Sequence, residues 1–244
     1  MKDKLYLWAH KEGTQNNRFN IPGISRISPM DACNYMGIEN VIMVKNCFEQ
    51  PSPDEYEKYA ESFNPLRKVV WSLTGAGGRY EKGELERIIS LKKKYPNITG
   101  AIMDDFFVPE IYSFTPEKIS KIREELHRNN MELWTVLYQH QLELNVENYL
   151  KGFDVITYWT WYGDRLKNLE EDFGKFFKKV GDKKKILGCY MWDYGNEKPL
   201  PLELMEKQCN LGLKWIKERK IEGIIFLASC ICDLKLEIVE WVRK

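Results

Sequence analysis

Short apolar runs alternate with amphipathic, helix-like stretches along the whole of the 244-residue chain. Eight of these runs have the length and the β-branched or apolar content that is typical of buried strands. They cover residues 4–10, 40–46, 68–74, 98–105, 132–140, 154–161, 185–193 and 222–229. Such an alternation is the pattern of a parallel sheet whose strands are joined by helical crossovers.

Nothing in the sequence divides the chain into separate units. There is no composition break, no Gly/Ser linker and no low-complexity segment. An open, doubly wound sheet is an alternative, but no GxGxxG follows the first run and no P-loop is present. We therefore expect a single-domain (β/α)₈ TIM barrel over residues 1–244, since such barrels commonly have about 250 residues.

The stretches between the strand candidates carry helix signals. Ser28, Ser52 and Thr115 each precede a proline, as an N-cap residue precedes proline at the first helical position. In the stretch after Thr115, apolar residues recur at helical spacing, so one face should pack on the barrel. The clearest helix candidates cover residues 52–63, 83–95, 115–129, 168–181 and 201–219.

Charge and apolar content argue against several classes of partner. The chain has 37 Lys and Arg against 36 Asp and Glu, so no global field favours nucleic acid or an anionic membrane. The first apolar run is shorter than a signal-peptide core, and no run approaches the roughly 20 apolar residues of a membrane span. We expect a cytoplasmic protein with neither nucleic-acid nor membrane partners; the sequence leaves its oligomeric state open.

No metal or cofactor is implied by the sequence. The six cysteines form no CxxC pair, and no histidines occur at zinc-like spacing. A metal-dependent enzyme would have to assemble its ligands from His10, Asp104 and His140.

The active site of a TIM barrel lies at the carboxyl ends of the strands, so residues from distant parts of the chain meet there. At these positions the sequence places hydrogen-bonding groups among flat aromatic rings. The candidates are His10, Lys45, Asn46, Asp104, Asp105, Tyr138, His140, Thr160, Trp161, Trp192, Asp193, Tyr194 and Ser229. Sugars combine hydroxyl groups with weakly polar C–H faces, so this mixture predicts a pocket for a small-molecule carbohydrate.

Two adjacent carboxylates, Asp104 and Asp105, stand where the fourth strand candidate ends. Successive strand residues point to opposite faces, but both can turn toward the pocket where strand becomes loop. One can then serve as a general acid whose pKa its ionised neighbour raises. Alternatively only Asp105 faces the pocket, or both accept hydrogen bonds without catalysing a reaction. Asp193 is a third carboxylate on the seventh strand candidate.

Three short stretches resemble the O-GlcNAcase family of retaining hexosaminidases and, more loosely, the related hyaluronidase and chitinase barrels. "IMDDFF" is similar to the family's Asp-Asp pair; "YWTWYGD" resembles its Trp-Thr-Gly turn, with Trp161 in place of the glycine; "MWDYGN", which contains Trp192, Asp193 and Asn196, resembles its aromatic segment with Asp and Asn. The resemblance implies that Asp104 orients the substrate's N-acetyl group, which attacks the anomeric carbon, and that Asp105 is the general acid and base. The other two stretches would bind sugar hydroxyls or the glycosidic oxygen.

The sequence thus predicts a glycoside hydrolase that acts on a small glycoside or oligosaccharide. Asp193 binds sugar or, if no N-acetyl group takes part, acts as a nucleophile opposite the Asp pair. One alternative is a carbohydrate-binding barrel without turnover. Another is an enzyme of small carbonyl compounds that uses a metal or an imine at Lys45; an ion pair with Asp104 is the structural alternative for that lysine.

Overall fold

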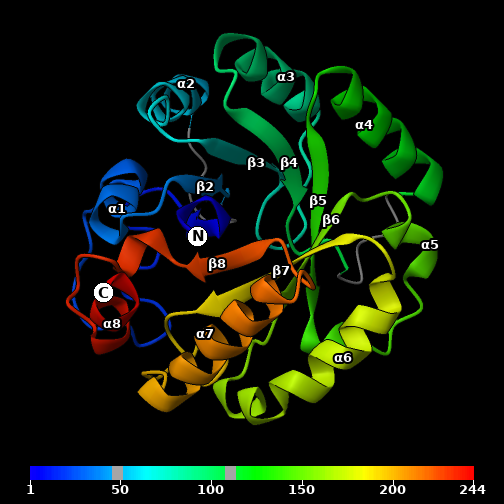
Figure 1. Cartoon of the computed structure of the whole chain (residues 1–244). Helices are drawn as coiled ribbons and strands as arrows, with labels where there is room; N and C mark the ends of the chain where they lie inside the picture. The colour runs from blue at the N-terminus through cyan, green and yellow to red at the C-terminus, as the bar shows by residue number, and fades with distance from the viewer. Residues whose placement is uncertain (46–51, 108–113) are drawn as a thin grey trace.

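The computed structural model describes residues 1–45, 52–107 and 114–244. Its eight strands are all parallel and pair in sequence order, and the last pairs with the first to close a barrel (Figure 1). They are β1 (Leu5–Ala9), β2 (Asn40–Met43), β3 (Lys68–Thr74), β4 (Ile98–Met103), β5 (Glu132–Tyr138), β6 (Val155–Trp159), β7 (Lys184–Tyr190) and β8 (Gly223–Leu227). The predicted (β/α)₈ barrel is confirmed, and each strand lies within or within one residue of its predicted run.

Helices surround the barrel as an outer ring (Figure 1). They are α1 (Pro29–Met36), α2 (Pro53–Ser62), α3 (Glu84–Lys94), α4 (Pro116–Arg128), α5 (Glu147–Leu150), α6 (Leu169–Val180), α7 (Leu202–Lys217) and α8 (Glu237–Arg243), with short 3₁₀ turns at Lys2–Lys4, Gln139–Gln141, Gly163–Asn168 and Ser229–Ile231. The three expected N-caps are confirmed, because the side chains of Ser28, Ser52 and Thr115 each accept a hydrogen bond from a first-turn amide.

The helices contact the barrel through apolar stripes. On α4 the stripe consists of Ile119, Ile122 and Leu126, all of them buried, as the helical spacing predicts. Within the residues that the structure describes, no helix is both long and apolar enough to cross a membrane.

Strand register sets which side chains are neighbours inside the barrel. Trp8 on β1 lies opposite Leu227 on β8, and Leu227 in turn lies opposite Tyr190 on β7. Between β6 and β7 the fit depends on a glycine: a Cβ atom at Gly188 would lie 2.1 Å from the Trp159 ring. The indole therefore lies directly against the backbone of β7.

Candidate active site

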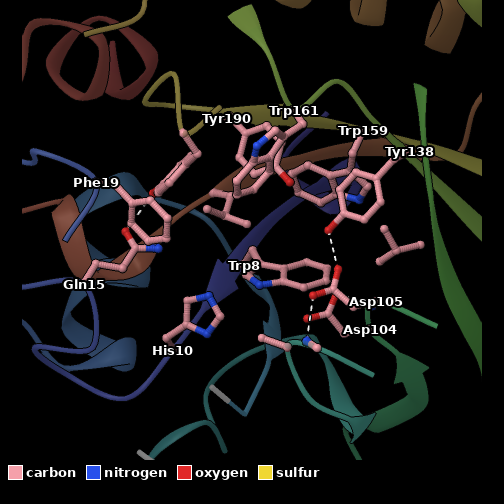
Figure 2. A pocket seen from close by; sticks show the side chains of 15 residues that line it. Trp8, His10, Gln15, Phe19, Asp104, Asp105, Tyr138, Trp159, Trp161 and Tyr190 are labelled. Atoms are coloured by element: carbon pink, nitrogen blue, oxygen red, sulfur yellow. Dashed lines mark hydrogen bonds between the residues drawn. The ribbon is translucent and has the colours of Figure 1, made fainter. Parts of the chain in front are cut away.

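A cavity of about 210 Å³ opens at the carboxyl ends of the strands. Figure 2 shows the side chains that surround it, with the two aspartates on one side and the aromatic rings around them. It is lined by Trp8, His10, Gln15, Phe19, Ala76, Gly77, Asp104, Asp105, Val136, Tyr138, Trp159, Trp161, Tyr190, Tyr194 and Leu227. The cavity is thus at the end of the barrel where the sequence places the site.

Asp104 and Asp105 both line the cavity, although they are adjacent in the chain. The strand has ended by Asp104, and Asp105 has a φ of +46°, in the left-handed region. A residue with a side chain rarely adopts this conformation, which costs roughly 1–2 kcal/mol for most residues and is best tolerated by Asn and Asp. The turn brings the second carboxylate to the same side as the first.

Asp104 is the more deeply buried of the two acids, with 4% of its surface exposed. Its Oδ1 accepts a hydrogen bond of 2.9 Å from the backbone N–H of Asp105, and its carbonyl accepts one from Thr74 Oγ1 at 2.7 Å. Burial, and after it the nearby charge of Asp105, raises the pKa of the Asp104 carboxyl well above its usual value. The environment therefore favours a protonated Asp104.

Asp105 accepts a hydrogen bond at each carboxylate oxygen. Tyr138 donates its hydroxyl to Oδ1 at 2.6 Å, and the backbone N–H of Gly77 donates to Oδ2 at 2.8 Å (Figure 2). Gly77 has a φ of +79°, where glycine is favoured. Both oxygens of Asp105 are thus held in place by a donor.

Aromatic rings form most of the remaining wall. The Trp161 ring lies near Tyr190 and Tyr194, with centroid separations of 5.6 and 6.0 Å, and Tyr194 also packs edge-on against Phe19 at 5.2 Å. Tyr194 donates its hydroxyl to Gln15 Oε1 at 2.7 Å, and burial raises its pKa well above the usual range. The rings are thus held by one another and by hydrogen bonds.

His10 contributes a neutral imidazole. Its Nδ1 is 3.0 Å from the carbonyl oxygen of Val44, which can only accept, so Nδ1 carries the proton and Nε2 is left as an acceptor. Burial lowers the His10 pKa to about 4. Ser229 does not line the cavity, but its Oγ accepts the backbone N–H of His10 at 3.2 Å, so it helps to position the histidine.

A second, shallower hollow of about 420 Å³ adjoins the cavity. Asp105, Tyr138 and Trp161 line both spaces, and the outer one is completed by His140, Gln141 and Tyr162. The His140 ring stacks on Tyr138 with a centroid separation of 5.3 Å and an interplanar angle of 10°, and burial lowers the His140 pKa. Asp105 therefore stands at the boundary between an enclosed space and an open one.

Asp193, Trp192 and Asn196 were expected in the site, but they do not line either hollow. Asp193, only 2% exposed, accepts hydrogen bonds from the backbone N–H of Gly163 at 2.9 Å and from the Asn196 amide at 2.9 Å. The Trp192 indole donates to the carbonyl of Phe19 at 2.9 Å. Their contacts hold the loops around the cavity, so we do not assign them contact with substrate.

Lys45 is likewise not part of the cavity. Its Nζ lies 2.8 Å from Glu84 Oε2, and both side chains are almost fully buried. The alternative ion pair with Asp104 is therefore wrong, because the partner is supplied by the first turn of α3. Thr160 is buried outside the cavity lining, and Asn46 lies outside the described residues.

Nine residues that line the cavity were not among the candidates from the sequence: Trp8, Gln15, Phe19, Ala76, Gly77, Val136, Trp159, Tyr190 and Leu227. Trp8 and Tyr190 both point inward from their strands, and the period-two alternation of strand residues could have identified them. Gln15 and Phe19 come from the connection between β1 and α1, where no sequence period marks a direction.

Among the described residues, no three His, Cys, Asp or Glu side chains are grouped as metal ligands would be, so the trio of His10, Asp104 and His140 is not assembled.

Comparison with known proteins extends only to the fold. No protein-family model and no curated protein matches the sequence. Among solved structures, the xylanase-A-amylase inhibitor protein XAIP-III matches with a TM-score of 0.64 at 16% identity, over 98% of this chain and 97% of that one. A chitinase from Chromobacterium violaceum gives 0.61 at 8% identity, over 98% of each chain. A mutant tryptophan synthase α-subunit from Pyrococcus furiosus gives 0.58 at 8% identity, over 99% of this chain and 95% of that one. The barrel is thus similar to those of a chitinase and an inhibitor, but also to that of an unrelated enzyme, and identities this low carry no activity across.

Proposed function

We propose that this protein is a glycoside hydrolase that removes a terminal sugar from a small glycoside or oligosaccharide. The observation that carries the proposal is the Asp104–Asp105 pair, whose two carboxyl groups line one aromatic cavity in contrasting environments. Two carboxyl groups with separate protonation states are what acid-assisted cleavage of a glycosidic bond requires. The similarity to a chitinase barrel is consistent with this chemistry.

The contacts favour Asp104 as the proton donor, the reverse of the order that the O-GlcNAcase resemblance implies. Its burial favours the protonated acid, whereas both oxygens of Asp105 already accept hydrogen bonds. As the glycosidic C–O bond breaks, Asp104 transfers its proton to the leaving oxygen. Asp105 stabilises the positive charge that develops at the anomeric carbon, or orients an N-acetyl group if the sugar carries one. Water completes the hydrolysis and returns a proton to Asp104.

The shape of the site supports cleavage at a chain end. The cavity of about 210 Å³ is smaller than the range of about 300–1,000 Å³ typical of sites for drug-sized ligands, so it suits a single sugar ring. The outer hollow beside Asp105 would take the leaving group, with Tyr162 and His140 as its aromatic wall. The bond to be cleaved would then lie where the two spaces meet, between the sugar ring beside Asp104 and the leaving group beside Asp105.

A sugar-binding barrel without turnover is the second candidate. The rings of Trp161, Tyr190 and Tyr194 would bind a sugar face whether or not a reaction follows, and the matching XAIP-III barrel is described as an inhibitor. An imine-forming enzyme is less well supported, because Lys45 is ion-paired with Glu84 outside the cavity.

The test is fluorophore release from aryl α- and β-glycosides, with and without an N-acetyl group, by the wild type and by Asp104→Asn and Asp105→Asn. Asp233→Asn is the matched control, since Asp233 is exposed, lines neither hollow and accepts a hydrogen bond from the backbone N–H of Arg26. Turnover that is lost in both pair variants but kept in the control would support the proposal. Saturable sugar binding with no release from any glycoside would instead support the binding barrel.

A further inference from the structure

The charged side chains that line the two hollows, among the described residues, are acidic. Among the described residues that line them, Asp104 and Asp105 are the only ones with an acidic or basic side chain other than histidine. Both histidines, His10 and His140, have pKa values lowered by burial. No Lys or Arg is among the described residues that line either space. Any ionised acid of the pair therefore faces the ligand without a basic counter-charge in the lining.

The nearest buried lysine does not alter this balance. Lys45 is held by Glu84 at 2.8 Å, and Glu84 is also 3.3 Å from Arg87. This cluster lies between β2 and α3 and shares no residue with the cavity lining. Among the described residues, the donors to the Asp105 carboxyl are the Tyr138 hydroxyl and the Gly77 amide, and neither of them carries a charge.

The aromatic wall adds to the same preference. The faces of tryptophan and tyrosine rings are negative, so they attract cations as well as C–H groups. Trp161, Tyr190 and Tyr194 lie within 6.0 Å of one another by ring centroid, and Tyr138 carries its hydroxyl to Asp105. Aromatic rings that line the same cavity as a carboxylate are a combination suited to organic ammonium groups.

We propose that the sugar bound in the cavity carries a free, protonated amino group, so that the substrate is an amino sugar rather than an N-acetylated, neutral or acidic one. This inference rests on the proposed glycosidase function and deepens it. Asp105 has two hydrogen bonds, and a carboxylate has about four acceptor positions, so it keeps capacity to accept from an ammonium group. The same charge repels uronic acids and sugar phosphates.

The experiment measures binding of four simple ligands to the full chain by calorimetry: the methyl glycosides of glucosamine, glucose, N-acetylglucosamine and glucuronic acid. We expect the glucosaminide to bind at least about tenfold more tightly than the glucoside, as a desolvated cation–π contact and an ion pair would give together. The glucuronide should bind least. Equal or tighter binding of the glucoside or the N-acetyl compound overturns the inference, as does the absence of binding by all four.

Two variants test the cause of the preference. Asp105→Asn should reduce the ratio of glucosaminide to glucoside affinity to near one, while the control Asp233→Asn keeps the wild-type ratio. Trp161→Leu, at the partly exposed rim of the cavity, is the second variant and should also lower the ratio. A wild-type ratio in both cavity variants would overturn the inference.

Failure of the inference and failure of the proposed function give different results. Hydrolysis of neutral aryl glycosides in preference to amino ones would keep the glycosidase and remove the amino-sugar specificity. Tight binding of the glucosaminide without hydrolysis of any aryl glycoside, aryl glucosaminides included, would keep the amino-sugar site and remove the glycosidase.

Discussion

Asp105 and Asp193 occupy equivalent places in the sequence pattern, just beyond the carboxyl end of a barrel strand, yet they lie in different surroundings. Asp105 lines the cavity and accepts hydrogen bonds from Tyr138 and Gly77, which leaves room for a ligand. Asp193 is turned to the loop after β6, where Gly163 donates to it, and Asn196 of its own loop also donates to it. The first carboxylate is thus open to a ligand in the cavity, whereas the second holds a loop.

The difference comes from the path of the chain after each aspartate. Beyond Asp105 the chain continues the turn through two buried phenylalanines, Phe106 and Phe107. The left-handed backbone conformation of Asp105 directs its side chain toward the cavity. Beyond Asp193 the chain folds back on itself, since the Asp193 and Lys198 backbones bond to each other. The Asn196 amide is thereby brought to the carboxylate. The position at a strand end selects candidates, and the turn after it decides which of them reach the site.

The largest expected effect is a loss of turnover when an acid of the Asp104–Asp105 pair is replaced, in contrast to Asp193. Asp104→Asn should lower kcat about 10²- to 10⁴-fold, the usual contribution of a general acid. Initial rates with aryl glycosides measure this, and circular dichroism shows that the variant is folded. A variant that keeps wild-type kcat would mean that Asp104 is not the proton donor.

At Asp193 we expect the converse, which is a loss of stability without a loss of turnover. Asp193→Ala leaves the buried amide of Gly163 without its acceptor, which should lower the free energy of unfolding by about 2 to 3 kcal/mol. Turnover per folded molecule should be unchanged. Urea denaturation measures the loss, and Asp193→Asn, which keeps one oxygen acceptor, should lose less. A large fall in kcat with unaltered stability would place Asp193 in the reaction after all.

The dependence of stability on pH provides a third contrast. Burial raises the pKa of Asp104 in the folded state above its ordinary value of 3.8, so the stability it contributes is present below that value and is lost as pH rises through the folded-state pKa. Asp104→Asn cannot ionise. Its free energy of unfolding should therefore rise relative to the wild type as pH increases above about 4. Thermal melts across this range test the trend, and a constant difference would contradict it.

The smallest effect concerns the outer hollow, which Asp105 borders and Asp193 does not. Tyr162 is 45% exposed and contributes to its wall. Tyr162→Ala should raise KM for a disaccharide about two- to tenfold through the loss of one stacking contact, with little change for a methyl glycoside. Equal changes for both substrates would show that the leaving group does not bind there.

The fold was predictable because its signals are local and repeated. Each strand run is short and apolar, and the proline after Ser28, Ser52 or Thr115 marks where a helix begins. Closure of the sheet followed from the number of such units and from the lack of nucleotide-binding loops. No long-range information was needed.

The site was only partly predictable. Strand-end position correctly brought His10, Asp104, Asp105, Tyr138, Trp161 and Tyr194 to the cavity and His140 to its outer hollow. It also selected Lys45, whose side chain turns to Glu84, a partner that no local pattern identifies. Phe19 and Gln15 enter the cavity wall from a connection whose path depends on tertiary contacts, such as that of Trp192 with the Phe19 carbonyl.

The close approach of Trp159 to Gly188 links two positions in the evolution of this barrel. Because the indole occupies the space of a side chain at 188, any larger residue there must push the ring toward the cavity. A wider binding space can therefore arise by shrinking residue 159, and only after that change would residue 188 be free to vary. The two sites should therefore substitute as a pair, and the depth of the pocket would change with them.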